Sequence, residues 1–279
     1  MGRNIDPNKV IISDPDCKEL ELWQDDKNSI PNKPTGNYLQ EVALGNIVGQ
    51  ESIFKFGRSE DIDTTERLIW DGAGGPTFEF PETLETITIV SDSVNDAAAG
   101  TGARTIIVYG LDDDFNSVFV VETLTGTTPV VTTQTFRRVY RAFILTSGTN
   151  SIIGDANDGT ITITHTTSTQ ILALILPNNG QTLMSQYTIP AGKSFAFTGI
   201  TLSVGQGKTC TFQVRMRNGT TPGDAFSVKF SMELYQSVFT STLSVPFIVP
   251  EKTDMAFTAT AAIGTLVAAI SWDGVLIDN

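Results

Sequence analysis

From about residue 84 onward, short runs of alternating apolar and polar residues dominate the chain. Leu84–Val90 (LETITIV) and Gly159–Thr166 (GTITITHT) alternate with a period of two, which is typical of strands with one buried face. We also expect a helical turn at Met184–Tyr187. Gly, Pro, Asn and Asp separate the runs, at the spacing typical of β-sandwiches. The other predicted strands are Arg104–Gly110, Ser117–Glu122, Thr135–Thr146, Ile171–Leu176, Ser194–Ile200, Thr209–Arg217, Ser227–Tyr235, Thr240–Val245, Met255–Ala261 and Leu266–Trp272.

The first fifty residues have a much weaker pattern. Two short strands are predicted, at Lys9–Ile12 and Glu19–Trp23, and three X-Pro pairs around them exclude a long helix. So few apolar anchors cannot form a core, so we expect this arm to become ordered by docking onto a larger surface.

Ser52–Gly75 joins the arm to the strand-rich remainder. It combines aromatic residues with an acidic turn, Ser59–Asp63, and a glycine-rich exit. We therefore predict an all-β protein with an N-terminal extended arm (1–50), a first β domain that includes the aromatic joint (51–176), and a second β-sandwich or jelly-roll-like domain (177–279). The predicted partner-binding residues are the apolar side chains of the arm and the joint: Val10, Ile11, Ile12, Leu20, Leu22, Trp23, Phe54, Phe56 and Trp70.

Charge and composition narrow the function classes. The net charge is −13 and charged residues make up only 18% of the chain. Nucleic-acid binding requires clustered Lys and Arg, so it is not expected. The most apolar stretches, Ile171–Pro177 and Ala256–Ile270, are too short or too interrupted to span a bilayer. The two cysteines, Cys17 and Cys210, are expected to be reduced thiols rather than a disulfide.

Candidate catalytic and metal-binding groups are few. The single histidine, His165, cannot supply a His-rich metal site, and a catalytic triad would need a serine elbow that is absent. We expect it on the surface of its strand. The acidic runs Asp112–Asp114, Ser59–Asp63 and Asp155–Asp158 lack the ligand spacing of a calcium loop, and Asp favours turns for conformational reasons. No metal or cofactor is predicted.

Paired carboxylates of the kind that a glycosidase uses are scattered along this sequence, and solvated charge is the preferred interpretation. The residues considered are Glu66, Asp71, Glu79 and Glu82. The glycine-rich segments Gly100–Gly102 and Gly205–Lys208 do not open a helix after a strand, so they are predicted to be turns and not phosphate loops. No enzymatic activity is predicted.

Arg137, Arg138 and Arg141 form the one basic cluster and alternate with aromatic residues. Nucleic acid or a glycan would suit such a cluster. Given the acidic chain, a strand salt-bridged to an acidic neighbour is the better interpretation, and an assembly surface fits equally well. In the two Trp-Asp-Gly segments, at Trp70 and Trp272, each tryptophan is expected to pack at a strand end before a turn.

Three segments resemble virion structural proteins of tailed bacteriophages. They are the joint (FKFGRSEDID…IWDG), AGTGARTIIVYGLDDDF…PVVTTQTFRRVYRAFI, and GQTLMSQYTIPAGKSFAFTGITLSVGQGK…VPEKTDMAFTA. Marine and cyanobacterial phages are the expected source of similar proteins, and the resemblance covers nearly everything after residue 45. It implies a non-enzymatic protein of the virion, made in the host cytoplasm, that serves as a capsid decoration (cement) or head-fibre protein.

The implied partners are the major capsid protein or other virion proteins, bound through the arm, together with further copies of the chain. A homotrimer is the first expectation and a dimer the second, and no heptad pattern predicts a coiled-coil shaft. An alternative is a tail or fibre-tip adhesin module that binds host surface carbohydrate, for which aromatic residues on loops of the C-terminal unit would be the sign. A polysaccharide depolymerase is a weaker third hypothesis.

Overall fold

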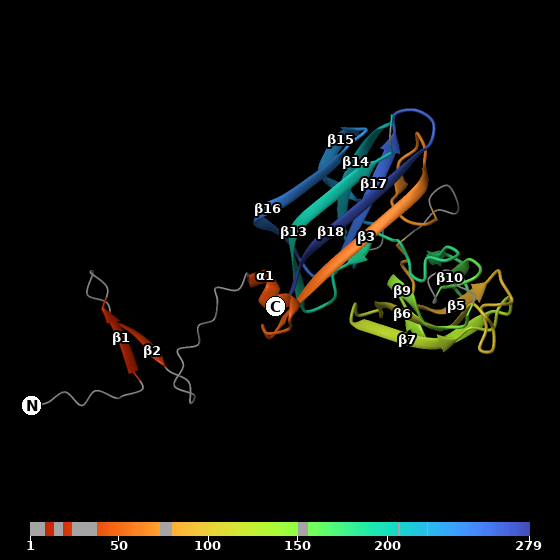
Figure 1. Cartoon of the computed structure of the whole chain (residues 1–279), viewed down its shortest axis with the longest axis horizontal. Coiled ribbons are helices and arrows are strands. Elements are labelled where there is room, and N and C mark those ends of the chain that lie inside the picture. The colour runs from red at the N-terminus through yellow and green to blue at the C-terminus, as the bar shows by residue number, and fades with distance from the viewer. Residues whose placement is uncertain are drawn as a thin grey trace, which may run out of the picture. The chain divides into compact units, whose positions relative to one another are not determined.

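A computed structural model describes residues 9–13, 19–23, 38–72, 80–149, 156–205, 207–221 and 223–279. The chain divides into two units, residues 1–47 and 48–279. All the paired strands are antiparallel, so the predicted all-β class with β-sandwich units is confirmed (Figure 1).

The described part of the first unit contains the two strands predicted in the arm and one short helix. β1 (Lys9–Ser13) and β2 (Glu19–Trp23) pair as an antiparallel hairpin, in a register that sets Val10 opposite Leu22 and Ile12 opposite Leu20. The helix α1 (Tyr38–Ala43) has only six residues.

Most of the second unit consists of two sandwiches, the larger of which we call the C-terminal sandwich. One of its sheets has the strand order β16-β13-β18-β3, and these long strands lie side by side in Figure 1. The other sheet has the order β12-β17-β14-β15, with β4 also paired to β17. The strands are β3 (Gln50–Ile62), β4 (Arg67–Leu68), β12 (Tyr187–Thr188), β13 (Lys193–Val204), β14 (Thr209–Asn218), β15 (Ser227–Tyr235), β16 (Val238–Val249), β17 (Thr253–Ala261) and β18 (Leu266–Asp278).

The smaller sandwich, which we call the inserted sandwich, pairs a four-stranded sheet of order β11-β10-β5-β8 with a three-stranded sheet of order β7-β6-β9. Its segment of chain lies between β4 and β12 of the C-terminal sandwich. The strands are β5 (Glu85–Ser91), β6 (Ala103–Leu111), β7 (Ser117–Thr123), β8 (Val130–Phe136), β9 (Arg138–Ser147), β10 (Ile161–His165) and β11 (Ile171–Ile175).

This insertion changes the predicted domain limits. We expected the joint in the first β domain, but β3 pairs with β18 from Gln50, opposite Ile277, to Ile62, opposite Leu266. β4 likewise pairs with β17. The physical reason is the burial pattern of β3, whose positions 55, 57, 59 and 62 face inward and complete the C-terminal sandwich. The joint is therefore an edge strand of that sandwich.

Four local predictions also need correction. Ser59–Ile62 is strand and not an acidic turn, since β3 runs through it. Thr135–Thr146 is divided between β8 and β9 at Arg137, and β18 continues through the Trp272 segment, where a turn was expected. Met184–Tyr187 forms no helical turn, because Met184 bridges to Trp70 and Tyr187 begins β12. Each departure comes from pairing with a strand distant in sequence, which a local pattern does not contain.

Each sandwich has its own core, and each core holds one tryptophan. Trp272 is fully buried in the C-terminal sandwich, stacked on Phe257 with ring centroids 5.3 Å apart, and its indole N–H donates to the Ser185 carbonyl at 3.0 Å. Trp70 lies in the core of the inserted sandwich. Because Trp70 lies only two residues after the strand β4 of the C-terminal sandwich, it ties the two bodies together.

Candidate functional site

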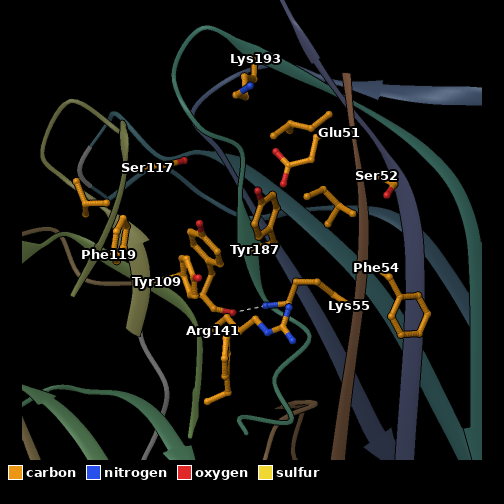
Figure 2. A pocket seen from close by; sticks show the side chains of 15 residues that line it. Glu51, Ser52, Phe54, Lys55, Tyr109, Ser117, Phe119, Arg141, Tyr187 and Lys193 are labelled. Atoms are coloured by element: carbon orange, nitrogen blue, oxygen red, sulfur yellow. Dashed lines mark hydrogen bonds between the residues drawn. The ribbon is translucent and has the colours of Figure 1, made fainter. Parts of the chain in front are cut away.

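A cleft lies between the two sandwiches. It is about 530 Å³ in volume and lies between β3 of the C-terminal sandwich and the outer face of the β7-β6-β9 sheet (Figure 2). Side chains from β3, β6, β7, β9, β12, β13 and β18 line it. A site at the junction of two bodies is where ligand pockets commonly form.

A row of three aromatic rings covers the side of the cleft formed by the inserted sandwich. Tyr109 on β6 is central, with its ring centroid 5.9 Å from that of Phe119 on β7 and 6.0 Å from that of Phe143 on β9. Phe119 is 61% exposed although it is a large aromatic residue on a strand. Register explains the row, because Tyr109 pairs directly with Phe119 and lies diagonally to Phe143.

Two basic side chains approach each other in the cleft. Lys55, on β3, is buried, and its ammonium donates to the Tyr140 carbonyl. Burial and the neighbouring Arg141 guanidinium lower the pKa of Lys55 to about 7. Arg141 lies over the Phe143 ring, 5.1 Å from its centroid. No carboxylate among the described residues forms a salt bridge with Lys55 or Arg141.

Polar groups complete the cleft. Glu51 and Ser52 come from β3, and Ser117 comes from the start of β7 on the opposite wall (Figure 2). Lys193 also lines the cleft, but its charge is paired with Asp278 at 2.5 Å. The cleft thus offers an aromatic wall, hydrogen-bonding groups and two cations without a carboxylate partner.

A second surface, which we call the open edge, lies along β15 and β16, the outer strands of the two sheets of the C-terminal sandwich. β16 is a twelve-residue strand without a charged residue (VFTSTLSVPFIV). Val245 is 82% exposed and Val238 68% exposed. Between the two strands, an apolar groove of about 210 Å³ reaches inward to the core residues Phe197 and Met216. Pro246 interrupts the ladder, as edge strands allow.

The predicted partner-binding residues lie in three different environments. The predicted residues of the arm lie in its two paired strands. These residues are Val10, Ile11 and Ile12 in β1, and Leu20, Leu22 and Trp23 in β2. Phe54 and Phe56 lie on the outer side of β3 with ring centroids 6.1 Å apart, and Phe54 is 63% exposed. Trp70 differs from the prediction, since burial in the inserted sandwich leaves it only 2% exposed and removes it from any partner surface.

The arginine cluster divides between two roles. Arg138 is buried and forms two hydrogen bonds with Asp254 of β17, at 3.0 and 2.9 Å. Arg217 reaches the same carboxylate at 3.0 Å and Thr188 donates to it at 2.6 Å. The predicted salt-bridged strand is therefore confirmed for Arg138, and the pair joins the two sandwiches. Arg137 pairs with Asp113 at 2.9 Å, whereas Arg141 faces the cleft.

The predicted acidic groups serve structure. The Asp112 carboxylate accepts from the backbone N–H of Asp114 at 2.9 Å and of Asn116 at 2.8 Å, which confirms the turn between β6 and β7. Glu66 forms two hydrogen bonds with Arg215, and Glu82 pairs with Arg217 at 3.0 Å.

The remaining predicted acids divide by location. Asp71 accepts from the Leu183 N–H at 3.1 Å, and burial raises its pKa to about 6. Glu79, Asp155 and Cys17 lie outside the described residues. Within the described ranges, no three His, Cys, Asp or Glu side chains come together as a metal site would require.

The prediction that His165 lies on the surface is wrong. Ile161, Ile163 and His165 occupy alternate positions of β10 and share its buried face. The imidazole Nε2 donates to the Phe136 carbonyl at 2.9 Å, and burial lowers the pKa of the ring. Cys210 is a buried free thiol whose pKa burial raises to about 11, so it is poorly nucleophilic.

The cleft was not predicted from the sequence. One signal was available: in Ser117–Glu122 the inward positions are Val118 and Val120, so Phe119 occupies an outward position where a polar residue is usual. The position of Lys55 across from Arg141 depends on the insertion of one sandwich into the other, which the local sequence does not reveal.

The sequence matches no protein-family model, and it matches no curated protein sequence. Among solved structures, the chain is similar to one described as the structure of infectious bursal disease virus Gx strain, with 8% identity, a TM-score of 0.21, and coverage of 82% of this chain and 71% of that one. It is also similar to the vicilin from Solanum melongena, with 8% identity, a TM-score of 0.14, and coverage of 97% and 82%. Such low TM-scores carry no argument about function. The described part of the chain holds no helix with the length and hydropathy of a membrane span.

Proposed function

We propose that this chain is a non-enzymatic virion structural protein of a tailed bacteriophage, acting as a capsid decoration (cement) or head-fibre protein. Its N-terminal arm binds the major capsid protein or another virion protein. Its body associates with further copies of itself, as a trimer in the first instance and a dimer in the second. Many copies that each bury a modest area would together strengthen a shell.

The observation that supports this proposal best is the open edge. Long apolar edge strands without charges are avoided or covered in proteins that remain monomeric, because their free N–H and C=O groups template further pairing. β16 carries no charge along twelve residues, and the core beneath it is reached by the apolar groove. A second copy of the chain that covers this edge would bury both the strand β16 and the apolar groove.

The arm supports the capsid half of the proposal. Its hairpin carries apolar residues on both strands and belongs to a unit separate from residues 48–279. A short hairpin by itself is only marginally stable in water. Extended segments of this kind bind by adding strands to exposed sheet edges or by filling apolar grooves.

Deleting residues 1–47 tests the arm. This deletion leaves all of β3 and the Gly49 carbonyl, which accepts from the Asp278 N–H at 2.8 Å, so the body keeps its ladder. We expect the truncated protein to retain its thermal transition but to lose cosedimentation with purified expanded capsids. The full-length chain is the matched control. Undiminished capsid binding by the truncated protein would refute the role of the arm.

A further inference from the structure

The cleft between the sandwiches has no role in the proposed assembly, yet it has the features of a binding site. Its aromatic row faces a concave space, and exposed aromatic rings on a strand face lose the benefit of burial unless a ligand covers them. Its volume of about 530 Å³ falls in the range of small-molecule sites.

The charges in the cleft favour an anionic ligand. The protein carries a net charge of −13, yet Lys55 and Arg141 are held close enough to repel each other in the cleft. The Lys55 ammonium has three N–H donors, and the Tyr140 carbonyl accepts one of them. Glu51 is the one acidic side chain among the residues that line the cleft. A carboxylate on the ligand would relieve the repulsion and accept hydrogen bonds from both cations.

The rest of the cleft favours a saccharide. Pyranose rings present a flat C–H face that packs on an aromatic ring, and Tyr109, Phe119 and Phe143 form a continuous aromatic surface of that kind. Glu51, Ser52 and Ser117 can bond ring hydroxyls. A single-stranded nucleic acid would also stack on aromatic rings, but it needs a basic groove along its backbone, and two cations in an acidic protein do not supply one.

We propose that the cleft between β3 and the β7-β6-β9 sheet binds an acidic saccharide, with a carboxylated sugar unit stacked on Tyr109 and Phe119 and its carboxylate held by Arg141 and Lys55. This binding is independent of capsid attachment through the arm. It places a glycan site on a sheet face of the inserted sandwich and not on the loops of the C-terminal unit.

The test is a glycan array followed by calorimetric titration, both with the full-length protein. The array carries sialylated, glucuronate-containing and neutral oligosaccharides. We expect saturable binding of acidic oligosaccharides, and at least tenfold weaker binding of the same oligosaccharides after reduction of their carboxyl groups to alcohols. Absence of acidic-glycan binding, or equal binding of the reduced and acidic forms, would overturn the proposal.

Variants locate the site. Phe119→Ala removes the most exposed ring of the row, and Arg141→Gln removes a cation while keeping a side chain that can hydrogen-bond. Each should weaken acidic-glycan binding at least tenfold without moving the thermal transition or capsid cosedimentation. Val94→Ala, an exposed apolar residue in the β5–β6 loop that does not line the cleft, is the matched control and should bind as the wild type. Unchanged binding by both cleft variants, or preferential binding of the oligonucleotide dT10, would contradict the assignment.

Discussion

The Lys55 side chain is buried beside the Arg141 guanidinium and donates to one backbone carbonyl, that of Tyr140. Its pKa therefore differs between the folded and the unfolded protein. Its ordinary pKa of 10.5 falls to about 7 in the folded protein. The groups that face it are Arg141, Tyr140 and Tyr187, and Glu51 is the acidic residue that lines the same cleft. Because the unfolded chain holds the Lys55 proton more tightly, it binds more protons than the folded state between about pH 7 and pH 10.5.

The free energy of unfolding should therefore rise with pH through the lower part of this window. Between pH 7 and pH 9 we expect a gain of about 2 kcal/mol from Lys55. Urea unfolding at a series of pH values measures it, and Lys55→Met should abolish the rise. Burial raises the pKa of Cys210 from 9.0 to about 11, so ionisation of this thiol in the unfolded chain opposes the rise only as the pH approaches 9. The pKa of Tyr140 rises from 10.0 to about 12, so this phenol opposes the rise mainly above pH 9. An equal rise in Lys55→Met would assign the effect to other groups.

Single residues show what a sequence can and cannot predict. The turn role of Asp112 was predictable because an Asx side chain acts on its own neighbours. The role of Asp96 was not. Its buried carboxylate accepts from Ser91 at 2.6 Å and from the backbone N–H groups of Ala103, Asp158 and Gly159, at 2.7, 2.8 and 2.9 Å. Two of those donors lie more than sixty positions away, and no local pattern indicates them.

At the scale of the strands, one buried carboxylate, Asp254 of β17, connects the two sandwiches. It is fully buried and faces two guanidinium groups, Arg138 of β9 and Arg217 of β14. A buried ion pair contributes little net stability when it is compared with an apolar packing. Removing one partner is costly, because a buried charge is left without compensation.

Asp254→Ala should consequently lower the free energy of unfolding by about 3–5 kcal/mol. Differential scanning calorimetry measures the change and also shows whether the two sandwiches then unfold separately. Glu60→Ala is the matched control, since Glu60 pairs with Arg58 on the exposed face of β3 and its loss should cost less than about 1 kcal/mol. A thermal transition of Asp254→Ala equal to that of the control would show that the pair does not hold the sandwiches together.

The elements also mark the limit of the sequence prediction. Alternation predicted the existence of most strands, because one buried face imposes a period of two. It did not predict which strands pair. β3 closes a sheet with β18, more than two hundred residues later, so the joint became part of the C-terminal sandwich and the first domain became an insertion. Pairing between strands distant in sequence depends on how the sheets pack and on which strand edges are free to pair. A short segment of sequence contains neither kind of information.

At the scale of the whole molecule, we propose that copies of the chain meet through the open edge. β16 offers free backbone groups along its outer side, and its exposed valines would be covered by a second β16 or β15. Closed cyclic symmetry lets identical edges satisfy one another, whereas an open arrangement would form fibres. A dimer or trimer that closes through this edge is the expected state in solution.

The double variant Val238→Asp/Val245→Asp tests this edge. Both side chains are largely exposed, so the fold should survive, while charges brought together across the interface of an acidic protein should repel. Analytical ultracentrifugation at micromolar concentration should show a trimer or dimer for the wild type and a monomer for the double variant. Val94→Asp, at a residue 71% exposed and distant in sequence, should leave the assembly intact. A wild-type protein that sediments as a monomer would remove the open edge as an interface between copies, and the arm would then be the remaining route into a particle.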